Sequence, residues 1–542
     1  MGSLSIFIIE NEVKSDLDNL FLRQDSAQWH DFYDECYKHL MVARERKFKI
    51  SFEGALTLIP LYYNQVSSSD DDDLLLKGVH VLDQILTLCD ERHHEECPDW
   101  HQILVKSSVF KECILAAVNN SDCHLQLFGV TQVLTCLKSN ARDLLTSQDD
   151  VVRGLIKSLG GGVSSVSTTA KTALVLLCEQ EQGLAALFSD SAALDALNTV
   201  MAVNDSSKFN VYEVVQRVCV LGSDQLSMVS NSGLLDQLVA EVSSSDTLSQ
   251  LAALQLLSEL MESEKALDHI KSAGVLHQLQ TALLQAHSSQ DSLAAMNIPG
   301  LLKVFGVVGR TRPELVCREH SAVVSLMLQL SSDSSSDPCL SIIALDTLVQ
   351  LANTSNAKKL LHYNFRSEVD EWLKTLGRQL QTAPMEQRAR RLSALVLLFS
   401  VPALPQDDRV ESDDLQELLQ GWYNLVFPCG TLEPVDKFMR LPFPEMHLEA
   451  YHLLRALIRL PWGAKMVAAN TATLKYLLDR STESCKEGKE LKYAVAKALL
   501  CNPEVLSEEA GKQAYDAFKA YVKNGPFYVE PYVELGVGHL HG

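Results

Sequence analysis

The sequence predicts an all-α protein built from tandem helical repeats. A four-residue apolar pattern recurs about every 41 residues, and each recurrence is followed by a polar turn and a second apolar stretch. No segment alternates apolar and polar residues convincingly enough to predict a strand. A chain of 542 residues is also too long for one globular core, and an array of small units avoids that limit.

Five anchor positions define the repeat. Phe110, Val152, Leu194, Leu235 and Leu276 follow one another at spacings of 42, 42, 41 and 41 residues. The residues three and seven positions after each anchor are also apolar. These positions share one face of a helix, so each unit is expected to open with an amphipathic helix.

A second helix is predicted to follow a polar turn in each unit. Asn210–Cys219 follows the polar run Asn204–Ser207, and Leu251–Leu260 follows Ser243–Asp246. Ser, Asp and Asn in such turns cap helices by accepting hydrogen bonds from free N–H groups. Two helices in about 41 residues match the armadillo/HEAT period of roughly 40–47. We therefore expect an armadillo/HEAT-like α-solenoid, a right-handed superhelix with a long concave groove.

The pattern divides the chain into four segments of one continuous solenoid. An N-terminal helical cap and first repeats occupy residues 1–108, and the regular repeats occupy 109–290. Pro299-Gly300 and the polar run Ser331–Asp337 indicate loops, which predicts an irregular helical and loop segment over 291–338. Helical patterns resume over 339–542, the expected C-terminal repeats and cap.

Charge and composition limit the classes of molecule that the protein is expected to bind. With 69 acidic and 47 basic residues, the net charge is −22, which disfavours nucleic acid because the phosphate backbone would be repelled. Two interpretations stay open: the acidity attracts a basic protein, or it only keeps a large protein soluble. The 13 Cys are scattered, which indicates reduced thiols and a cytoplasmic or nuclear protein. The apolar stretch near Leu392–Leu404 is too short for a bilayer, so no membrane partner is expected.

No catalytic signature is found in the sequence, so the protein is not expected to be an enzyme or to use a cofactor. Gly160-Gly161-Gly162 lacks the Lys of a phosphate-binding loop and indicates a turn. One cluster of Cys and His residues is a candidate zinc site, namely Cys89, His93, His94, Cys97 and His101. Pro98 interrupts the helical spacing, so a polar helix end is the favoured interpretation and a zinc-dependent enzyme the disfavoured one.

Two further features allow two interpretations each. The acidic runs Asp70–Asp73 and Asp407–Asp414 are typical of solvated loops, and could instead contact a basic partner. The C-terminal segment Gly525–Leu535 contains Phe527, Tyr528 and Tyr532, which are costly to leave exposed. It is interpreted as the end cap of the solenoid, with an exposed docking peptide as the alternative.

Seven segments carry a resemblance to a known family. They are Asn210–Val215, Pro299–Gly306, Pro442–Leu457, Pro461–Val467, Tyr476–Glu483, Lys492–Leu499 and Gly525–Pro531. In this order they resemble the 26S proteasome non-ATPase regulatory subunit 5 family, from about Phe110 to Pro531, whereas the first 100 residues depart from the pattern.

The resemblance implies an assembly chaperone for the base of the proteasome regulatory particle. Members of the family are helical solenoids that bind the C-terminal domain of one proteasomal ATPase subunit. The intermediate also holds a second ATPase subunit and the large non-ATPase scaffold subunit, and the chaperone leaves before the mature 26S particle forms. The alternative is an armadillo/HEAT adaptor for a different transport or signalling partner.

Groove-facing polar residues on second helices are the predicted partner-binding residues. Asn210, Glu213 and Arg217 lie three and four residues apart on one helical stripe, and Lys303 is a further candidate. Ordinary solvated helix surface is the competing interpretation for all four. Tyr212 and Phe305 are expected in the core.

Overall fold

The computed structural model describes residues 75–83, 108–138, 149–244, 246–289, 292–333, 337–401 and 413–529, together with Asp34, Tyr63, Ser67 and Asp73. The chain divides into two compact units, residues 1–266 and 267–542. Within the described ranges every regular element is an α-helix or a short 3-10 helix. This confirms the predicted all-α class.

The first unit is a stack of short helices. Its described helices are α6 (Ser108–Val118), α7 (Cys123–Lys138), α9 (Asp149–Leu159), α10 (Ser164–Leu177), α11 (Glu181–Phe188), α12 (Ser191–Met201), α13 (Asp205–Cys219), α14 (Ser223–Asn231), α15 (Leu234–Ala240) and α16 (Thr247–Leu260). The anchors open α9, α12 and α15 as predicted, and Val152, Leu155 and Leu159 are buried along one face of α9.

The second unit continues in the same style, and the boundary between the units falls within α17 (Glu264–Ser272). Its other helices are α18 (Val275–Ser288), α19 (Ser292–Ala295), α20 (Ile298–Thr311), α21 (Pro313–Glu319), α22 (Ser321–Ser332), α23 (Pro338–Leu351), α24 (Ser355–Asn364), α25 (Arg366–Thr382), α26 (Met385–Phe399), α27 (Asp413–Val426), α28 (Glu433–Met439), α29 (Pro444–Ile458), α30 (Pro461–Ala469), α31 (Thr471–Leu478), α32 (Lys486–Leu500), α33 (Pro503–Ala510) and α34 (Lys512–Asn524).

Described repeats such as α11–α13 and α14–α16 hold three helices, which corrects the prediction of two. The sequence analysis missed a short first helix, seen as α11 in one repeat and α14 in the next. A helix of two turns is too short to produce a clear 3.6-residue period, so its sequence resembles a connection. A repeat is therefore the triplet α11–α12–α13, and the following repeat is α14–α15–α16.

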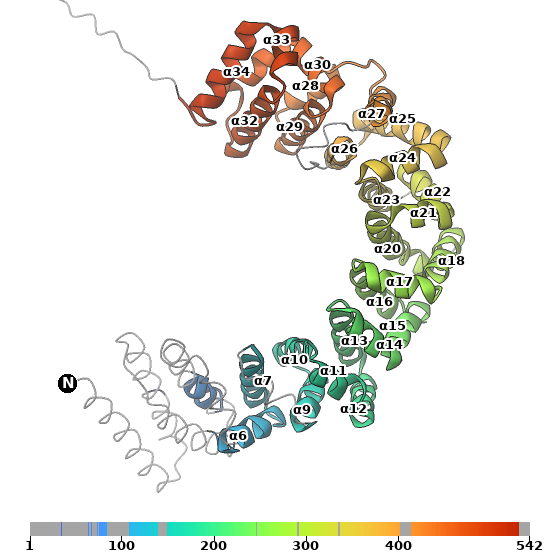
Figure 1. Cartoon of the computed structure of the whole chain (residues 1–542), viewed down its shortest axis with the longest axis vertical. Helices are drawn as coiled ribbons and strands as arrows, with labels where there is room; N and C mark the ends of the chain where they lie inside the picture. The colour runs from blue at the N-terminus through green and yellow to red at the C-terminus, as the bar shows by residue number, and fades with distance from the viewer. Residues whose placement is uncertain are drawn as a thin grey trace, which may run out of the picture. The chain divides into compact units, whose positions relative to one another are not determined.

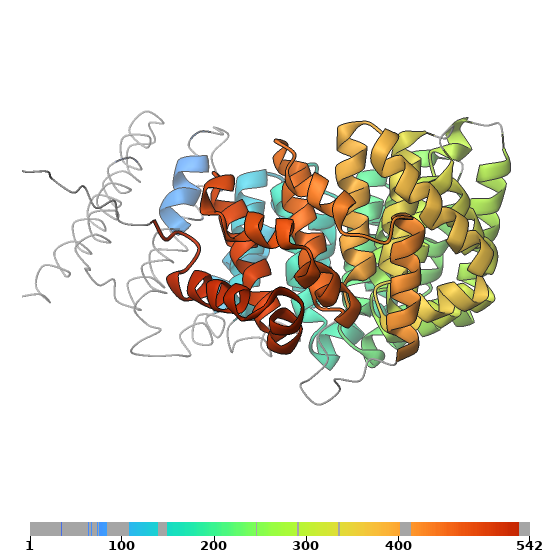
Figure 2. The same ribbon diagram turned by 90° about the horizontal axis from the view of Figure 1, so that it is seen from above.

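Equivalent helices of successive repeats pack against each other as layers within each unit (Figures 1 and 2). In the second unit, the first-helix layer is α21, α24, α27, α30 and α33, and the third-helix layer is α20, α23, α26, α29 and α32. The second helices α22, α25, α28, α31 and α34 complete the repeats. In the first unit α7, α10, α13 and α16 form the third-helix layer.

Helix N-termini are capped where the polar turns predict it. Asn204 Oδ1 accepts a hydrogen bond from Ser207 N at 2.8 Å and starts α13. Asp246 Oδ2 accepts one from Ser249 N at 2.8 Å and starts α16. Both caps satisfy N–H groups that the first turn of a helix leaves without partners.

The Pro299-Gly300 pair lies inside a helix, so the predicted loop is wrong there. Pro299 occupies the first turn of α20, where its missing N–H costs nothing because that turn has no hydrogen-bond acceptor for it. Phe305 and Leu302 on the same helix are fully buried. Proline therefore marks the start of α20.

The segment Leu293–Thr311 is long and apolar enough by composition to cross a membrane, with a mean hydropathy of 1.2. Most of it is α20, whose apolar face packs against α23 of the next repeat. The sandwiched position of a third helix explains this composition, since such a helix is covered on more than one side.

Two glycines let neighbouring helices approach closely. A Cβ built on Gly463 in α30 would lie 2.2 Å from the carbonyl oxygen of Leu457 in α29, and one on Gly183 in α11 would lie 2.3 Å from the Leu177 oxygen in α10. Both glycines sit at the same place in their repeats, where a first helix meets the end of the preceding third helix. No side chain fits at either position.

We expect Gly463→Ala to lower the free energy of unfolding by about 1–3 kcal/mol, because the added methyl group collides with backbone that cannot rotate away. Gly421→Ala is the matched control: Gly421 lies in α27 with open space around its Cβ position, so alanine should stabilise by up to about 1 kcal/mol. Urea titrations followed by circular dichroism measure both. Equal effects of the two substitutions would contradict the packing described here.

Candidate functional site

Asn210 lies on α13 with its side chain turned to the neighbouring repeat. Its Nδ2 donates a hydrogen bond of 2.9 Å to the carbonyl oxygen of Leu159, at the C-terminal end of α9. That carbonyl has no partner within its own helix, so the bond acts as a cap between repeats. The structure thus gives Asn210 a packing role, and its partner-binding role stays a prediction.

Glu213 and Arg217 lie on the open face of the third-helix layer of the first unit. The Glu213 carboxylate pairs with Lys171 Nζ of α10, and its other oxygen lies 4.0 Å from an Arg217 guanidinium nitrogen. The side chains of Glu213 and Arg217 are 37% and 36% exposed, whereas Lys171 is 11% exposed. One carboxylate between two cations leaves a local excess of positive charge, which suits an acidic group on a partner.

Lys303 lies in the second unit, exposed on α20. Arg310, seven residues further on, is exposed on the same side of this helix. Phe305 is fully buried and Tyr212 of the first unit is 2% exposed, which confirms the core positions predicted for both. Burial, with Glu241 nearby, raises the pKa of the Tyr212 hydroxyl well above its usual range.

The third-helix layer of the second unit exposes basic side chains that the sequence analysis did not single out. They are Arg390 on α26, Arg455 on α29, Arg459 at the end of α29 and Lys497 on α32. Exposed acidic residues on the same helices, such as Glu386 and Glu445, lie in first turns instead. On α29 and α32 this distribution complements the helix dipole, whereas Arg390 lies in the second turn of α26.

One carboxylate of this layer is partly buried. Burial raises the pKa of Asp346 on α23, and the charge of Arg390 on the next helix opposes that rise. The sequence hint for these residues is a charged position flanked by buried apolar neighbours, as in Leu453 and Leu454 before Arg455. This pattern predicts that the charged residue is exposed, but it does not predict on which layer of the solenoid the residue lies.

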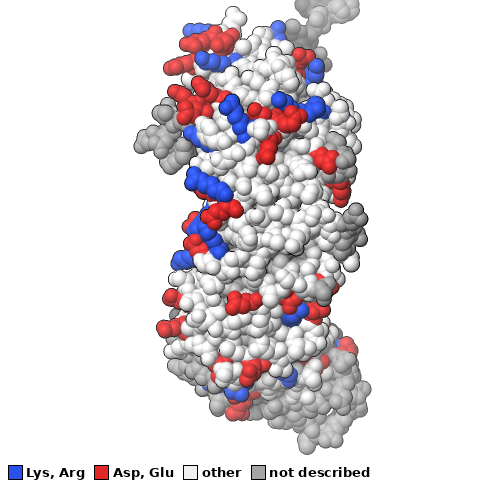
Figure 3. All heavy atoms as spheres, turned by 90° about the vertical axis from the view of Figure 1, so that its right-hand side faces the viewer, with Lys and Arg blue, Asp and Glu red and all other residues white. Residues whose placement is uncertain are grey.

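Acidic and basic side chains are interspersed on the face drawn in Figure 3, where they form small groups separated by uncharged surface. Some charged side chains of the second unit form ion pairs: Arg312 with Asp268, and Lys271 with Glu319 at 2.7 Å. The net charge of −22 is therefore not gathered into one acidic field on this face. Exposed pairs of this kind add little stability.

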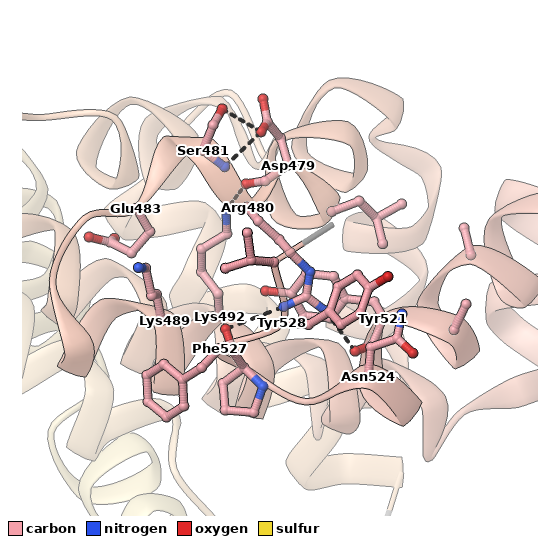
Figure 4. Close-up of a pocket in the computed structure, with 15 residues that line it drawn as sticks. Asp479, Arg480, Ser481, Glu483, Lys489, Lys492, Tyr521, Asn524, Phe527 and Tyr528 are labelled. Carbon is pink, nitrogen blue, oxygen red and sulfur yellow. Dashed lines mark hydrogen bonds between the residues drawn. The ribbon is translucent and has the colours of Figure 1, made fainter. Parts of the chain in front are cut away.

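A cavity of about 740 Å³ lies near the C-terminal end of the second unit, between the end of α31, α32 and α34 (Figure 4). Arg480 crosses it and donates hydrogen bonds to the carbonyl oxygens of Tyr521 at 3.0 Å and Gly525 at 2.7 Å. Its guanidinium also lies 3.9 Å from the centre of the Tyr521 ring. Arg480 thus caps the last turn of α34, where a cation is favourable.

The start of the C-terminal tail is held against the end of the second unit at Gly525, Pro526 and Tyr528. Arg480 also contacts the carbonyl oxygen of Pro526, at 3.3 Å, and the ring of Tyr528, at 5.5 Å. The side chains of Phe527 and Val529 are nevertheless 53% and 82% exposed. The backbone is held while two apolar side chains face solvent, so both interpretations of the tail retain support.

Lys492 is a buried cation beside the same cavity. Its Nζ donates to the carbonyl oxygens of Tyr476 at 2.8 Å and Asp479 at 2.6 Å and to Thr482 Oγ1 at 2.6 Å. These acceptors lie where α31 ends, so Lys492 closes that helix. Burial lowers the pKa of Lys492 to about 8.

Some predicted features lie outside the described residues: the cluster of Cys89, His93, His94, Cys97 and His101, most of both acidic runs, and Tyr532.

The fold and its open polar faces define a helical-repeat protein of the armadillo/HEAT class. Kap121p has a similar fold, with a TM-score of 0.53 and 11% sequence identity, covering 95% of this chain and 55% of that one. A second Kap121p structure gives a TM-score of 0.52 at 12% identity, covering 96% and 52%. At these identities the likeness concerns the fold alone.

The chain belongs to the proteasome non-ATPase 26S subunit family, whose model matches residues 61–537. Human 26S proteasome non-ATPase regulatory subunit 5 is 26% identical over 465 residues, covering 83% of this chain and 89% of the relative. Its bovine counterpart is 27% identical over 397 residues, covering 72% and 76%. The resemblance found in the sequence is thereby confirmed.

Lys492→Met should lower the free energy of unfolding by about 1–3 kcal/mol at pH 7, because buried carbonyl groups lose their donor. The loss should grow as pH rises from about 8 towards 10.5. In that window the unfolded chain holds the lysine proton and the folded chain releases it, which stabilises the folded wild type by up to about 1.4 kcal/mol per pH unit.

Urea titrations of both proteins across this pH range measure the difference. Lys489→Met, on the same helix and less buried, is the control and should change neither the midpoint nor its pH dependence appreciably. A pH-independent difference between wild type and Lys492→Met would contradict the lowered pKa.

Proposed function

We propose that this protein is an assembly chaperone for the base of the 26S proteasome regulatory particle. It binds the C-terminal domain of a proteasomal ATPase subunit, in an intermediate that also contains a second ATPase subunit and the large non-ATPase scaffold subunit. It leaves before the mature 26S particle forms, and it catalyses no reaction itself. The observation that carries this proposal is the family match over residues 61–537.

The repeat architecture supports a steric mechanism. One side of a third-helix layer packs against the other helices of the same repeats. The opposite side exposes polar side chains such as Lys303 and Arg455. Such a face can hold a small folded domain across several repeats at once. While bound, that domain's contact surface is covered, and assembly contacts release it by competing for the same surface.

The thiols support a reducing compartment, so we place the protein in the cytoplasm or the nucleus. None of the ten cysteines in the described ranges is in a disulfide. Burial raises the pKa of Cys136 and Cys219 to about 12, so these thiols stay protonated and inert. Exposed free thiols such as Cys339 and Cys501 suit a compartment that keeps cysteines reduced.

The decisive experiment is a binding assay of the full chain against each of the six isolated ATPase C-terminal domains. We expect one domain to bind and the others not, because complementary charge and shape give specificity. Lys303→Glu should weaken that binding by about tenfold, equivalent to about 1.4 kcal/mol.

Lys465→Glu is the matched control, since Lys465 is equally exposed but lies on α30 in the first-helix layer. It should leave the affinity unchanged. Equal binding to all six domains, or to none, would contradict the chaperone proposal and favour an adaptor for another partner.

A further inference from the structure

Three side chains with metal-binding atoms converge between two successive third helices of the second unit. His447 comes from the first turns of α29, Glu483 from the segment before α32, and Cys485 from the N-cap position of α32. One ligand atom from each lies within 4.8 Å of the others. Imidazole, thiolate and carboxylate are the three groups by which proteins bind zinc.

Two of the separations between these side chains are close to those of neighbouring zinc ligands. His447 Nε2 lies 3.5 Å from Glu483 Oε2, and Cys485 Sγ lies 3.4 Å from Glu483 Oε1. Two ligands at zinc bond lengths and the tetrahedral angle are separated by about 3.4 Å for nitrogen and oxygen, and by about 3.6 Å for sulfur and oxygen. The two distances end on different oxygens of the Glu483 carboxylate, and all three ligand atoms lie within 4.8 Å of one another, so side-chain rotation would bring them around one ion.

The His447 ring is oriented as a metal ligand. Its Nδ1 lies 3.3 Å from the carbonyl oxygen of Leu441, and since that oxygen can only accept, Nδ1 carries the proton. The lone pair of the neutral ring is then on Nε2, which is buried and makes no hydrogen bond within the described part of the chain. Metal-binding histidines are commonly oriented in this way by a carbonyl group on the second nitrogen.

The Glu483 carboxylate is buried without a directly bonded lysine or arginine. Its side chain is 6% exposed, and its hydrogen bonds come from the N–H groups of Ser484 and Cys485 and from the Cys485 thiol. Lys492 is nearby, but its three donors are directed to Tyr476, Asp479 and Thr482. A buried carboxylate needs compensating positive charge, which a divalent ion would supply.

The backbone is built tightly around this carboxylate. A Cβ on Gly488 would lie 2.2 Å from Glu483 Cδ, so a larger residue there would displace the Glu483 carboxylate. The N–H group of Gly488 donates to Cys485 Sγ at 3.3 Å, at the start of α32. Binding a metal ion there would require this thiol to lose its proton.

We propose that His447, Glu483 and Cys485 form a zinc site that links α29 to α32. Three protein ligands leave the fourth tetrahedral position for a water molecule. The ion would join consecutive repeats at the C-terminal end of the unit and would stabilise the folded state by its own binding free energy. This inference does not depend on the proposed chaperone function.

The test is metal analysis of the purified full chain in a Cys89→Ser/Cys97→Ser background, which removes the other His and Cys cluster as a source of zinc. We expect one equivalent of zinc per chain by mass spectrometry. Replacing it with Co²⁺ should give a sulfur-to-cobalt charge-transfer band, which reports a thiolate ligand directly. Added Zn²⁺ should raise the melting temperature of the metal-free protein.

Cys485→Ser keeps an acceptor for the Gly488 N–H but lacks the thiolate. It should therefore lose the sulfur-to-cobalt charge-transfer band. Its zinc affinity should fall at least tenfold, because even residues that only support metal ligands usually contribute about tenfold or more. His447→Gln should lose affinity while retaining part of the band, a second route if one variant folds poorly. Cys501→Ser is the control, because Cys501 is an exposed cysteine at the end of the same helix.

Two results would overturn the inference. One is a folded parent protein that binds neither Zn²⁺ nor Co²⁺, which would leave His447 and Glu483 as a simple ion pair. The other is a charge-transfer band that survives in folded Cys485→Ser, which would move the site to another cysteine.

Discussion

Packing between third helices of neighbouring repeats is the interaction on which the other features depend. In the second unit α23 is held between α20 and α26, and α29 between α26 and α32. Gly306 and Gly309 on α20 permit this approach, because a Cβ at these positions would lie 2.7 Å from Thr347 Cγ2 and 2.9 Å from Leu351 on α23. A helix covered on both flanks and on its core side has one face left, and that face exposes polar residues such as Lys303 and Arg455.

This constraint connects stability with the proposed function. A single three-helix repeat cannot cover its apolar surfaces, so it is stable only with neighbours. The same stacking aligns one exposed stripe from each repeat, and residues far apart in sequence such as Lys303, Arg390 and Arg455 come to share one layer. Binding specificity can then be spread over several repeats, with no need for a closed pocket.

Local signals in the sequence predicted much of the fold. Four of the five anchors are buried as the spacing requires, and Leu194 is partly buried. The Asn204 and Asp246 caps lie where polar residues precede apolar runs. The short first helices were missed because two turns give no distinct period. Pro299 was misinterpreted because proline is compatible both with a loop and with the first turn of a helix.

The candidate sites depended more on contacts between distant residues. The exposure of Lys303 could be predicted from its place on the predicted helix alone. The bond from Asn210 to Leu159 joins residues 51 positions apart, and Arg480 caps a helix that ends 44 positions later, so neither role has a local signature. The same holds for His447 and Cys485, whose proximity results from the register of two adjacent repeats.

Photo-crosslinking tests the central claim, that the open third-helix layer is the docking face, most directly. A photoreactive amino acid would be placed at Lys303, Gln350 or Lys497 in the third-helix layer, or at Lys374 or Lys465 in the other two layers; all five positions are exposed. The account predicts cross-links to the bound ATPase domain from the third-helix positions and none from the others. Cross-links only from Lys374 or Lys465 would contradict it.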